Sequence, residues 1–482
     1  MAEAKFTTGS TMRHVAVMTT TGGAGLMALF LVDVLNLFYI SLLGQRELAA
    51  AIGFAGTVQF FMISMAIGLS IAATAVVSRA VGAGDQARAR RLAASSLVLL
   101  LAVIGAAVAL VWIGRGAALD LLGASGETRD IAAGFLAITL PSLPLMGMGM
   151  IAGGLLRAVG DGRRAMFITL TGGAAAAVLD PILIFAMGLG IDGAAIALVI
   201  TRTIFALVGL YLAVHVHNMV GRIDLRAAAA DARTILGIGL PSMATQISTP
   251  FGNAFLTGVV AAHGDAAVAG WAVIGRLTPL AFGVIFALSG AVGPILGQNR
   301  GAGLWGRIRM AYRDALVFSA AWVLSAWAAL WLATDLIVRS FQLTAEGAEV
   351  LRAFTTLGAG AFLFTGALFV SNAAFNNLGR PTLSTAFNWS RDAAAIPLLA
   401  LVIGDSAGAS GVILVQAAAG LVVGSAAALY AWHFIGRLSR AAPGADAVAI
   451  AQPAFASGRT ALAAQLVAEE SSSALAPRKD SR

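Results

Sequence analysis

The stretch LMALFLVDVLNLFYISLL, residues 26–43, decides the fold class of this chain. It contains Asp33 and lies in a segment with no other charged residue between Arg13 and Arg46. Because roughly 20 apolar residues cross the hydrocarbon core of a bilayer, this segment predicts a transmembrane helix. A carboxylate near the middle of such a helix costs roughly 3 kcal/mol or more. We therefore interpret Asp33 as a residue that carries an ion or a proton, with Asn36 one helical turn away.

A second acid lies equally deep in the stretch AMFITLTGGAAAAVLDPILIFAMGL, residues 165–189. This acid is Asp180, and together with Asp33 it predicts a membrane transporter whose coupling chemistry is a pair of carboxylates. Pro181 follows Asp180 and leaves a backbone carbonyl of the helix without its usual donor. Asp180 can be interpreted as a coupling residue or as a structural residue at a kink, and the two roles are compatible.

The composition excludes a soluble protein. Hydrophobic residues make up 59% of the 482 residues and charged residues 11%, whereas soluble domains have about 25% charged residues. The mean hydropathy is +0.88, so we expect an all-α integral membrane protein. The chain has no cysteine, and its five histidines lie at span ends or in loops. We therefore expect no metal site, no cofactor and no enzymatic activity.

The apolar runs predict twelve transmembrane helices. Their expected ranges are 14–43, 53–80, 92–114, 130–157, 164–188, 191–215, 233–261, 267–297, 311–334, 349–377, 383–404 and 410–436.

Basic residues predict the orientation of these spans. With the N-terminus inside, the inner segments hold 19 Lys and Arg residues and the outer segments hold 5. An excess of basic residues marks the cytoplasmic side, so we expect both termini in the cytoplasm and the chain in a bacterial inner membrane. The formal charge of +8 mostly reflects this bias and a basic tail, and we do not expect nucleic-acid binding.

The two halves of the chain repeat. Gly82 and Gly301 begin matching Gly-Ala-Gly sequences 219 positions apart, and Gly160 and Gly379 keep the same offset. Six helices per half make the two repeats parallel. We expect a cytoplasmic N-terminus (1–13), a first lobe (14–215), a cytoplasmic linker (216–232), a second lobe (233–437) and a disordered cytoplasmic tail (438–482).

Five loop motifs, taken in order, carry a family resemblance. They are LVDVLNLFYISLLGQRELAAAIG (31–53), SRAVGAGDQARARRL (78–92), LLRAVGDGRRAM (155–166), LDPILIFAMGLGIDGAAIA (179–197) and GQNRGAG (297–303). Together they resemble the multidrug and toxic compound extrusion (MATE) family rather than the major facilitator superfamily, which also has twelve spans. The resemblance implies a V-shaped pair of helical lobes that exchange an organic substrate for sodium or protons.

The resemblance also implies where the coupling acids lie. One branch of the family has acids on the seventh and tenth spans, and here those spans contain no interior acid. Asp33 and Asp180 match the first-span and fifth-span acids of the DinF-like branch, which couples in its N-lobe. We interpret the C-terminal half as lacking interior acids and as selecting the cargo. Substrate-cavity candidates are Gln246, Asn253, Asn372, Tyr39 and Met62.

Departures from the family pattern predict the coupling ion. Members that bind sodium in the N-lobe have an Asn one turn before the fifth-span acid and a Thr on the sixth span. This chain has Ala176 and Leu198 there, although Thr201 lies nearby. Since sodium requires several oxygen ligands, by analogy with other hard cations, we predict a proton, with sodium as the alternative. Arg202 could support coupling by pairing with Asp180, or it could be structural.

The sequence therefore predicts a proton-coupled antiporter that exports organic, mostly cationic amphiphilic drugs by alternating access. The alternatives are a sodium-coupled multidrug antiporter, a flippase or exporter of lipid-linked or anionic cargo, and a membrane protein that transports nothing. The expected partners are small organic cations, protons or sodium, and membrane lipids. We expect a monomer.

Overall fold

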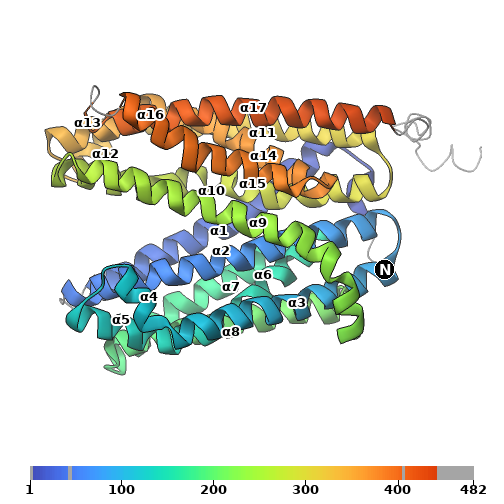
Figure 1. Cartoon of the computed structure of the whole chain (residues 1–482), viewed down its shortest axis with the longest axis horizontal. Coiled ribbons are helices and arrows are strands. Elements are labelled where there is room, and N and C mark those ends of the chain that lie inside the picture. Colours follow the sequence, from blue (N-terminus) through green and yellow to red (C-terminus); the bar gives the residue numbers. More distant parts are fainter. Residues whose placement is uncertain (1–3, 42–45, 404–407, 442–482) are drawn as a thin grey trace, which may run out of the picture.

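The computed structural model describes residues 4–41, 46–403 and 408–441, and these ranges form helices without a β-strand (Figure 1). The first half contains α1 (Thr11–Ser41), α2 (Arg46–Gly82), α3 (Gln86–Ile113), α4 (Arg115–Leu121), α5 (Gly126–Thr139), α6 (Leu143–Ala158), α7 (Gly162–Pro181) and α8 (Gly190–Tyr211). The second half contains α9 (Leu225–Ala261), α10 (Asp265–Gly301), α11 (Trp305–Leu332), α12 (Thr334–Ser340), α13 (Ala345–Ala353), α14 (Ala359–Leu378), α15 (Pro381–Trp389), α16 (Ile396–Ile403) and α17 (Gly411–Ala441).

Short irregular helices join several of these elements. Two are 3-10 turns, η1 (Lys5–Thr7) and η2 (Leu140–Ser142). Four are π-helical, η3 (Ile182–Ala186), η4 (Leu212–Val216), η5 (Phe354–Gly358) and η6 (Ser390–Ala395). In the described residues, 11 helical segments are long and apolar enough to cross a membrane. The predicted seventh span falls on α9, whose 37 residues include many polar side chains.

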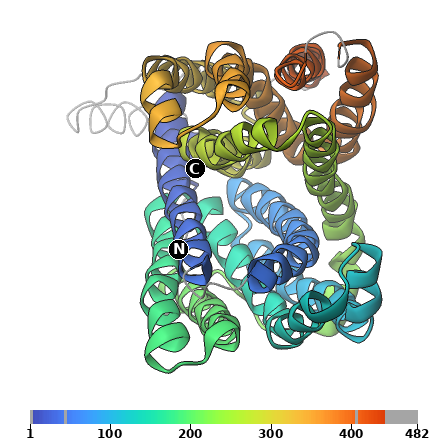
Figure 2. The same cartoon turned by 90° about the vertical axis from the view of Figure 1, so that its left-hand side faces the viewer.

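The helices form two lobes, α1–α8 and α9–α17 (Figures 1 and 2). The lobes meet at the end of the molecule where the N-terminus and the last turn of α17 lie, on the right in Figure 1. We call this the termini end. Towards the opposite end the ribbons of the two lobes diverge, and the molecule has the V shape that the sequence predicts. α1 packs against α7 of its own lobe and α10 of the other, and α9 packs against α15 and α2.

The internal repeat is confirmed by backbone geometry. Gly84 and Gly303 have φ of 75° and 73°, and Gly160 and Gly379 have φ of 80° and 90°. This left-handed region is open to glycine at little steric cost. Each pair is 219 residues apart, so the same turn connects corresponding helices in both halves.

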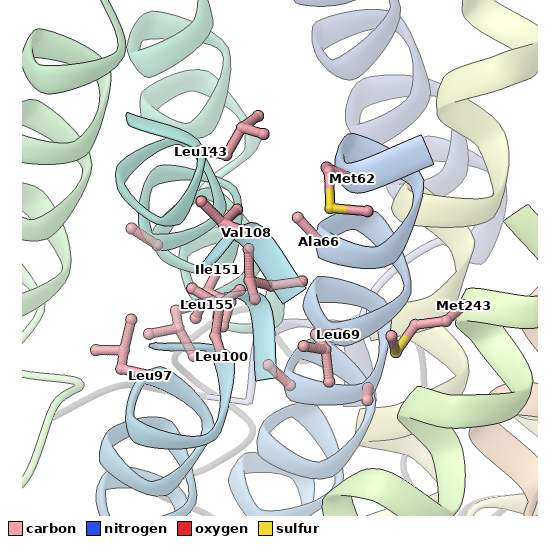
Figure 3. Packing of buried hydrophobic residues seen from close by; sticks show 14 of the residues in the cluster. Met62, Ala66, Leu69, Leu97, Leu100, Val108, Leu143, Ile151, Leu155 and Met243 are labelled. Atoms are coloured by element: carbon pink, nitrogen blue, oxygen red, sulfur yellow. The ribbon is translucent and has the colours of Figure 1, made fainter. Parts of the chain in front are cut away.

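The core of the first lobe is built from aliphatic side chains of α2, α3 and α6 (Figure 3). Leu100 and Leu155 are fully buried there, and Met243 reaches this cluster from α9. Met62, a candidate for the substrate cavity, is 9% exposed and lies in this core. Its described contacts are therefore those of a packing residue.

The polar segment 216–232 is partly helical, because α9 begins at Leu225. Asp224 caps this helix by accepting hydrogen bonds from the backbone N–H groups of Arg226 (2.8 Å) and Ala227 (3.2 Å). An aspartate at this position satisfies donors that the first turn leaves free. The connection between the lobes is thus short.

Candidate functional site

The candidate coupling site lies where α1 packs along α7. A Cβ placed on Gly173 would lie 3.4 Å from Val32 Cγ2, and further along the two helices the rings of Tyr39 and Phe185 meet edge to face at 6.1 Å. These two contacts fix the register of α1 against α7 and η3. Asp33 and Asp180 belong to the two segments between the contacts, 32–39 and 173–185. The backbone thus brings the two acids to one interface.

Only one of the two acids has a described side chain. Asp180 is 2% exposed at the last turn of α7. The side chains of Asp33 and Asn36 lie outside the described residues, although their backbone belongs to α1.

The helix changes its hydrogen-bond pattern directly after Asp180. Pro181 has no N–H to donate, and the π-helical segment η3 follows it. The backbone N–H of Met187 donates to Ile182 O at 2.9 Å, which is the longer i to i+5 pattern. The predicted kink is therefore present as a change of helix type. A buried acid at such a junction can link its protonation to the shape of the helix.

The two positions at which the sodium-binding pattern has polar side chains are apolar in this chain. Ala176 and Leu198 are half-buried and apolar. Thr201 has a buried Oγ1 with no hydrogen-bond partner among the described residues. One hydroxyl is thus available where the sodium-binding pattern requires two polar side chains.

Arg202 is held by oxygen atoms of three other elements. It is 5% exposed, and its guanidinium donates to Thr139 O (2.9 Å), Ser142 Oγ (2.9 Å) and Gln59 Oε1 (2.5 Å). These described contacts join α8 to α5, η2 and α2 and do not include Asp180. Sequence reasoning missed Gln59, although a lone amide in the apolar run of α2 was a usable signal.

The prediction that the C-terminal half lacks an interior acid is wrong. Asp392 in η6 is 2% exposed and forms a bidentate ion pair with Arg391, with Nε–Oδ1 at 2.7 Å and Nη2–Oδ2 at 3.1 Å. It packs beside Gly252 of α9, where a Cβ would lie 3.1 Å from Asp392 Oδ1. Arg391 and Asp392 are both buried in this π-helical turn, at 9% and 2% exposed. Helical periodicity could not predict this.

The polar cavity candidates of the second lobe lie in different surroundings. Asn372 is 5% exposed, and its Oδ1 accepts a hydrogen bond from Asn388 Nδ2 at 3.0 Å. Gln246 is half-buried, and Asn253 is exposed. The structure therefore places Asn372 inside a polar network between α14 and α15, and Asn253 at the surface of α9.

At the termini end, α2 and α10 cross with their backbones in contact. A Cβ on Gly82 would lie 2.0 Å from Gln298 O, and a Cβ on Gly301 would lie 2.0 Å from Arg79 O. No side chain fits at either position without movement of the backbone. The two glycines correspond by the repeat offset, so the crossing is symmetric.

Polar side chains reinforce this crossing from both lobes. Arg79 Nη2 donates to Asn376 O at 3.0 Å, and Gln298 Nε2 donates to Ala158 O at 2.7 Å. Each side chain reaches the last turn of a helix in the other lobe, where backbone carbonyls lack partners within the helix.

The N-terminal segment adds a strap across the same end. Phe6 is 2% exposed, and its backbone N–H donates to Gln298 Oε1 at 2.8 Å. Arg307 donates to the carbonyl oxygens of Phe6, Thr8 and Gly9 at 3.0–3.1 Å. Residues 6–9 are thereby fixed to the second lobe, although α1 belongs to the first.

Two buried acids of the second lobe complete the closed end, and each bonds to a helix of the first lobe. Thr11 Oγ1 of α1 donates to Asp314 Oδ2 of α11 at 2.5 Å. Asp231 of α9 accepts hydrogen bonds from Arg91 at 3.1 and 3.2 Å and from Ser95 Oγ at 2.9 Å, both in α3. Ser95 and Asp314 are 219 residues apart. The first helix of each lobe is therefore bound by the third helix of the other.

Comparisons with known proteins agree with this architecture. The MatE family model matches residues 24–182 and 241–401, one stretch in each half. An FAD transporter of Shewanella oneidensis is 29% identical over 300 residues, which cover 61% of this chain and 66% of that protein. The multidrug export protein MepA of Staphylococcus aureus is 27% identical over 273 residues, 55% of this chain and 59% of that protein. The matches span less than two thirds of either relative.

Solved structures share the whole fold. A mutant of the Vibrio cholerae MATE transporter VcmN has a TM-score of 0.82 at 24% identity, covering 89% of this chain and 97% of that chain. The outward-facing conformation of a multidrug resistance MATE family transporter has a TM-score of 0.85 at 23% identity, covering 91% and 99%. At these identities the likeness concerns the fold.

Proposed function

The chain belongs to the MatE family, whose members are transporters, and from this premise we propose that it is a proton-coupled antiporter that exports organic cations. The observation that carries the proposal is Asp180, a carboxyl 2% exposed at a break in its helix. It lies on the segment that packs along the Asp33 segment of α1. Burial favours the neutral form of a carboxyl, so proton uptake and release can follow the hydration of this interface.

Charge considerations support a cationic cargo. Among the described interior basic residues, Arg391 is neutralised by Asp392, and Arg202 donates to three oxygen atoms. Arg391 is thus matched in charge, and both Nη groups of Arg202 are occupied, while its Nε has no hydrogen-bond partner among the described residues. The name of one relative, an FAD transporter, favours a second candidate, the export of an anionic nucleotide cofactor. FAD therefore serves as the contrasting probe in the tests below.

The transport cycle follows from the lobes meeting at one end. We take this arrangement as the outward-facing state, with the termini end in the cytoplasm, because 19 of the 24 basic residues counted on the loops lie on that side. Protons from outside neutralise the acids of the first lobe and change its preferred hydration. Cargo leaves, and the lobes then rock to open the termini end. A ligand shifts such an equilibrium only by its different affinity for the two states.

The proposal is tested by transport in everted membrane vesicles. Uptake of a fluorescent organic cation should run on an imposed pH gradient in sodium-free buffer and should collapse with a protonophore. Asp33→Asn and Asp180→Asn should each abolish this uptake. The matched control is Asp192→Asn, which changes an exposed acid of α8 and should retain it.

Three outcomes decide between the candidates. Uptake that needs sodium and ignores the protonophore at fixed pH overturns proton coupling. Uptake of FAD in place of the organic cation contradicts the proposal that the cargo is cationic. Wild-type uptake in both acid variants overturns the coupling site. If the missing oxygen ligands explain the ion preference, Ala176→Asn with Leu198→Thr should introduce some sodium dependence.

A further inference from the structure

A group of basic residues at the termini end of the second lobe takes no part in the site described above. Arg309 lies near the start of α11, and His433, Arg437 and Arg440 lie in the last turns of α17. All four are exposed. No ion pair among the described residues involves the three arginines. Within the part of the chain that the structure describes, no acidic side chain pairs with their charge.

Two adjoining hollows lie beside these residues. The polar hollow has a volume of about 300 Å³ and is lined by Arg309, Trp432, His433, Gly436, Ser439 and Arg440. The apolar hollow has a volume of about 320 Å³ and is lined by Ala426, Leu429, Tyr430, His433, Phe434 and Arg437. His433 lines both, so the two hollows adjoin on the surface of α17, and we call them together the groove. Its polar part lies towards the termini end and its apolar part towards the middle of the helix.

Local contacts organise the polar hollow. The Arg309 guanidinium lies 4.3 Å from the centre of the Trp432 ring, a cation–π contact between α11 and α17. Arg440 Nε donates to Gly436 O at 3.2 Å, and His433 Nδ1 bonds to Leu429 O at 2.8 Å. These contacts position the side chains and supply no anion. The remaining N–H groups of Arg309 and Arg440 are donors suited to phosphate oxygens.

We propose that this groove binds an anionic phospholipid. The phosphate is held by Arg309 and Arg440, and an acyl chain lies along Leu429 and Tyr430, which are 62% and 46% exposed. Both helices are candidate membrane spans with the basic residues near one end of each, which is where a headgroup lies. Basic pockets between transmembrane helices on the cytoplasmic side bind such headgroups. The apolar half of the groove favours a lipid over free phosphate.

Trp432 makes the proposal measurable, because a brominated acyl chain quenches a nearby indole. The full-length protein is placed in phosphatidylcholine vesicles that contain equal fractions of brominated phosphatidylglycerol or brominated phosphatidylcholine. The signal of Trp432 is the difference between each protein and the same protein with Trp432→Phe. We expect phosphatidylglycerol to quench this signal several-fold more effectively than phosphatidylcholine.

Variants distinguish binding of the lipid in the groove from nonspecific attraction of anionic lipid to the basic surface of the protein. Arg309→Gln with Arg440→Gln should abolish the preference for phosphatidylglycerol. The matched control, Arg222→Gln with Arg226→Gln, removes the same charge from exposed residues elsewhere at this end and should keep the preference. Equal quenching by the two lipids, or a preference that the Arg309/Arg440 variant retains, overturns the proposal. Loss of the preference on adding millimolar inorganic phosphate assigns the groove to a free anion and also overturns it.

Discussion

Two buried carboxyls of this protein lie at π-helical turns. Asp392 lies within η6 and forms an ion pair with Arg391 at 2.7 Å. Asp180 lies at the end of α7, directly before Pro181 and η3. The ion pair supports a structural role for Asp392, and the place of Asp180 at a change of helix type supports the proposal that it couples transport to the shape of the helix.

We predict that Asp392→Asn destabilises the protein by about 3–5 kcal/mol, because it leaves the Arg391 charge buried without a partner. The double variant Arg391→Met with Asp392→Leu should cost markedly less, since no charge is left behind. Thermal unfolding of the detergent-solubilised protein measures both. A single variant that unfolds no earlier than the double variant would contradict this view of the pair.

At the residue level, sequence could identify an acid only by its apolar surroundings. Asp33 and Asp180 are each the one charged residue in a long apolar run, and this contrast with the neighbouring residues identifies them. The burial of Asp392 was not predicted, because Arg391 precedes it and a charged pair near the end of a span is ordinarily solvated. Its burial comes from packing against Gly252 of α9, a tertiary contact that the local sequence does not indicate.

Among the elements, the crossing of α2 and α10 depends on glycine. We predict that Gly82→Ala abolishes or severely impairs transport and lowers stability by about 2–3 kcal/mol, because the new methyl group would meet Gln298 O at 2.0 Å. Gly105→Ala is the matched control, since nothing lies within 4 Å of that Cβ position in α3. Transport and thermal unfolding measure both variants. Equal behaviour of the two would show that the crossing tolerates a side chain.

The turn before α7 provides a pH-dependent contribution to stability. Burial would raise the pKa of Asp161, but hydrogen bonds from the backbone and side chain of Arg164 and from His217 hold this pKa below its ordinary value. A lowered folded-state pKa stabilises the protein above the unfolded pKa, about 3.9, and this contribution is lost as pH falls through the folded value.

We therefore predict that Asp161→Asn lowers the unfolding temperature at pH 7 and that the deficit shrinks as the pH falls below about 4. Asp85→Asn is the comparison, because Asp85 caps α3 through the backbone N–H of Arg88 and has no described ion pair. Unfolding scans across this pH range measure the difference. A deficit at Asp161 that is constant with pH would exclude the charge as its cause.

The spans themselves were largely predictable, since each predicted range falls on one long helix or a few consecutive helices. The breaks within spans were not. Pro181 indicated the change after α7, and Pro397, two residues beyond η6, cannot donate an N–H to Ala393 O within η6. η5 contains no proline, so proline alone does not account for the π-helical turns.

For the whole molecule, the closed end is held by reciprocal contacts between the lobes. We predict that Asp231→Asn, which removes the charge facing Arg91 at 3.1 Å, opens this end more often. Ser78 is fully buried beside the crossing, and the chain has no cysteine. Alkylation of a single Ser78→Cys thiol should therefore accelerate several-fold in the Asp231→Asn background. Asp192→Asn is the control, and equal alkylation rates in both backgrounds would show that this contact does not hold the lobes together.

The strap formed by residues 6–9 has a consequence for biosynthesis. These residues leave the ribosome before the second lobe, and Gln298, Arg307 and Asp314, to which the N-terminal segment is bonded, are made about 300 residues later. At typical synthesis rates of roughly 5–20 residues per second, the N-terminal segment waits at least about 15 seconds for them. Its docking is therefore among the last steps of assembly, and protection of this segment from protease marks chains whose two lobes have both been inserted.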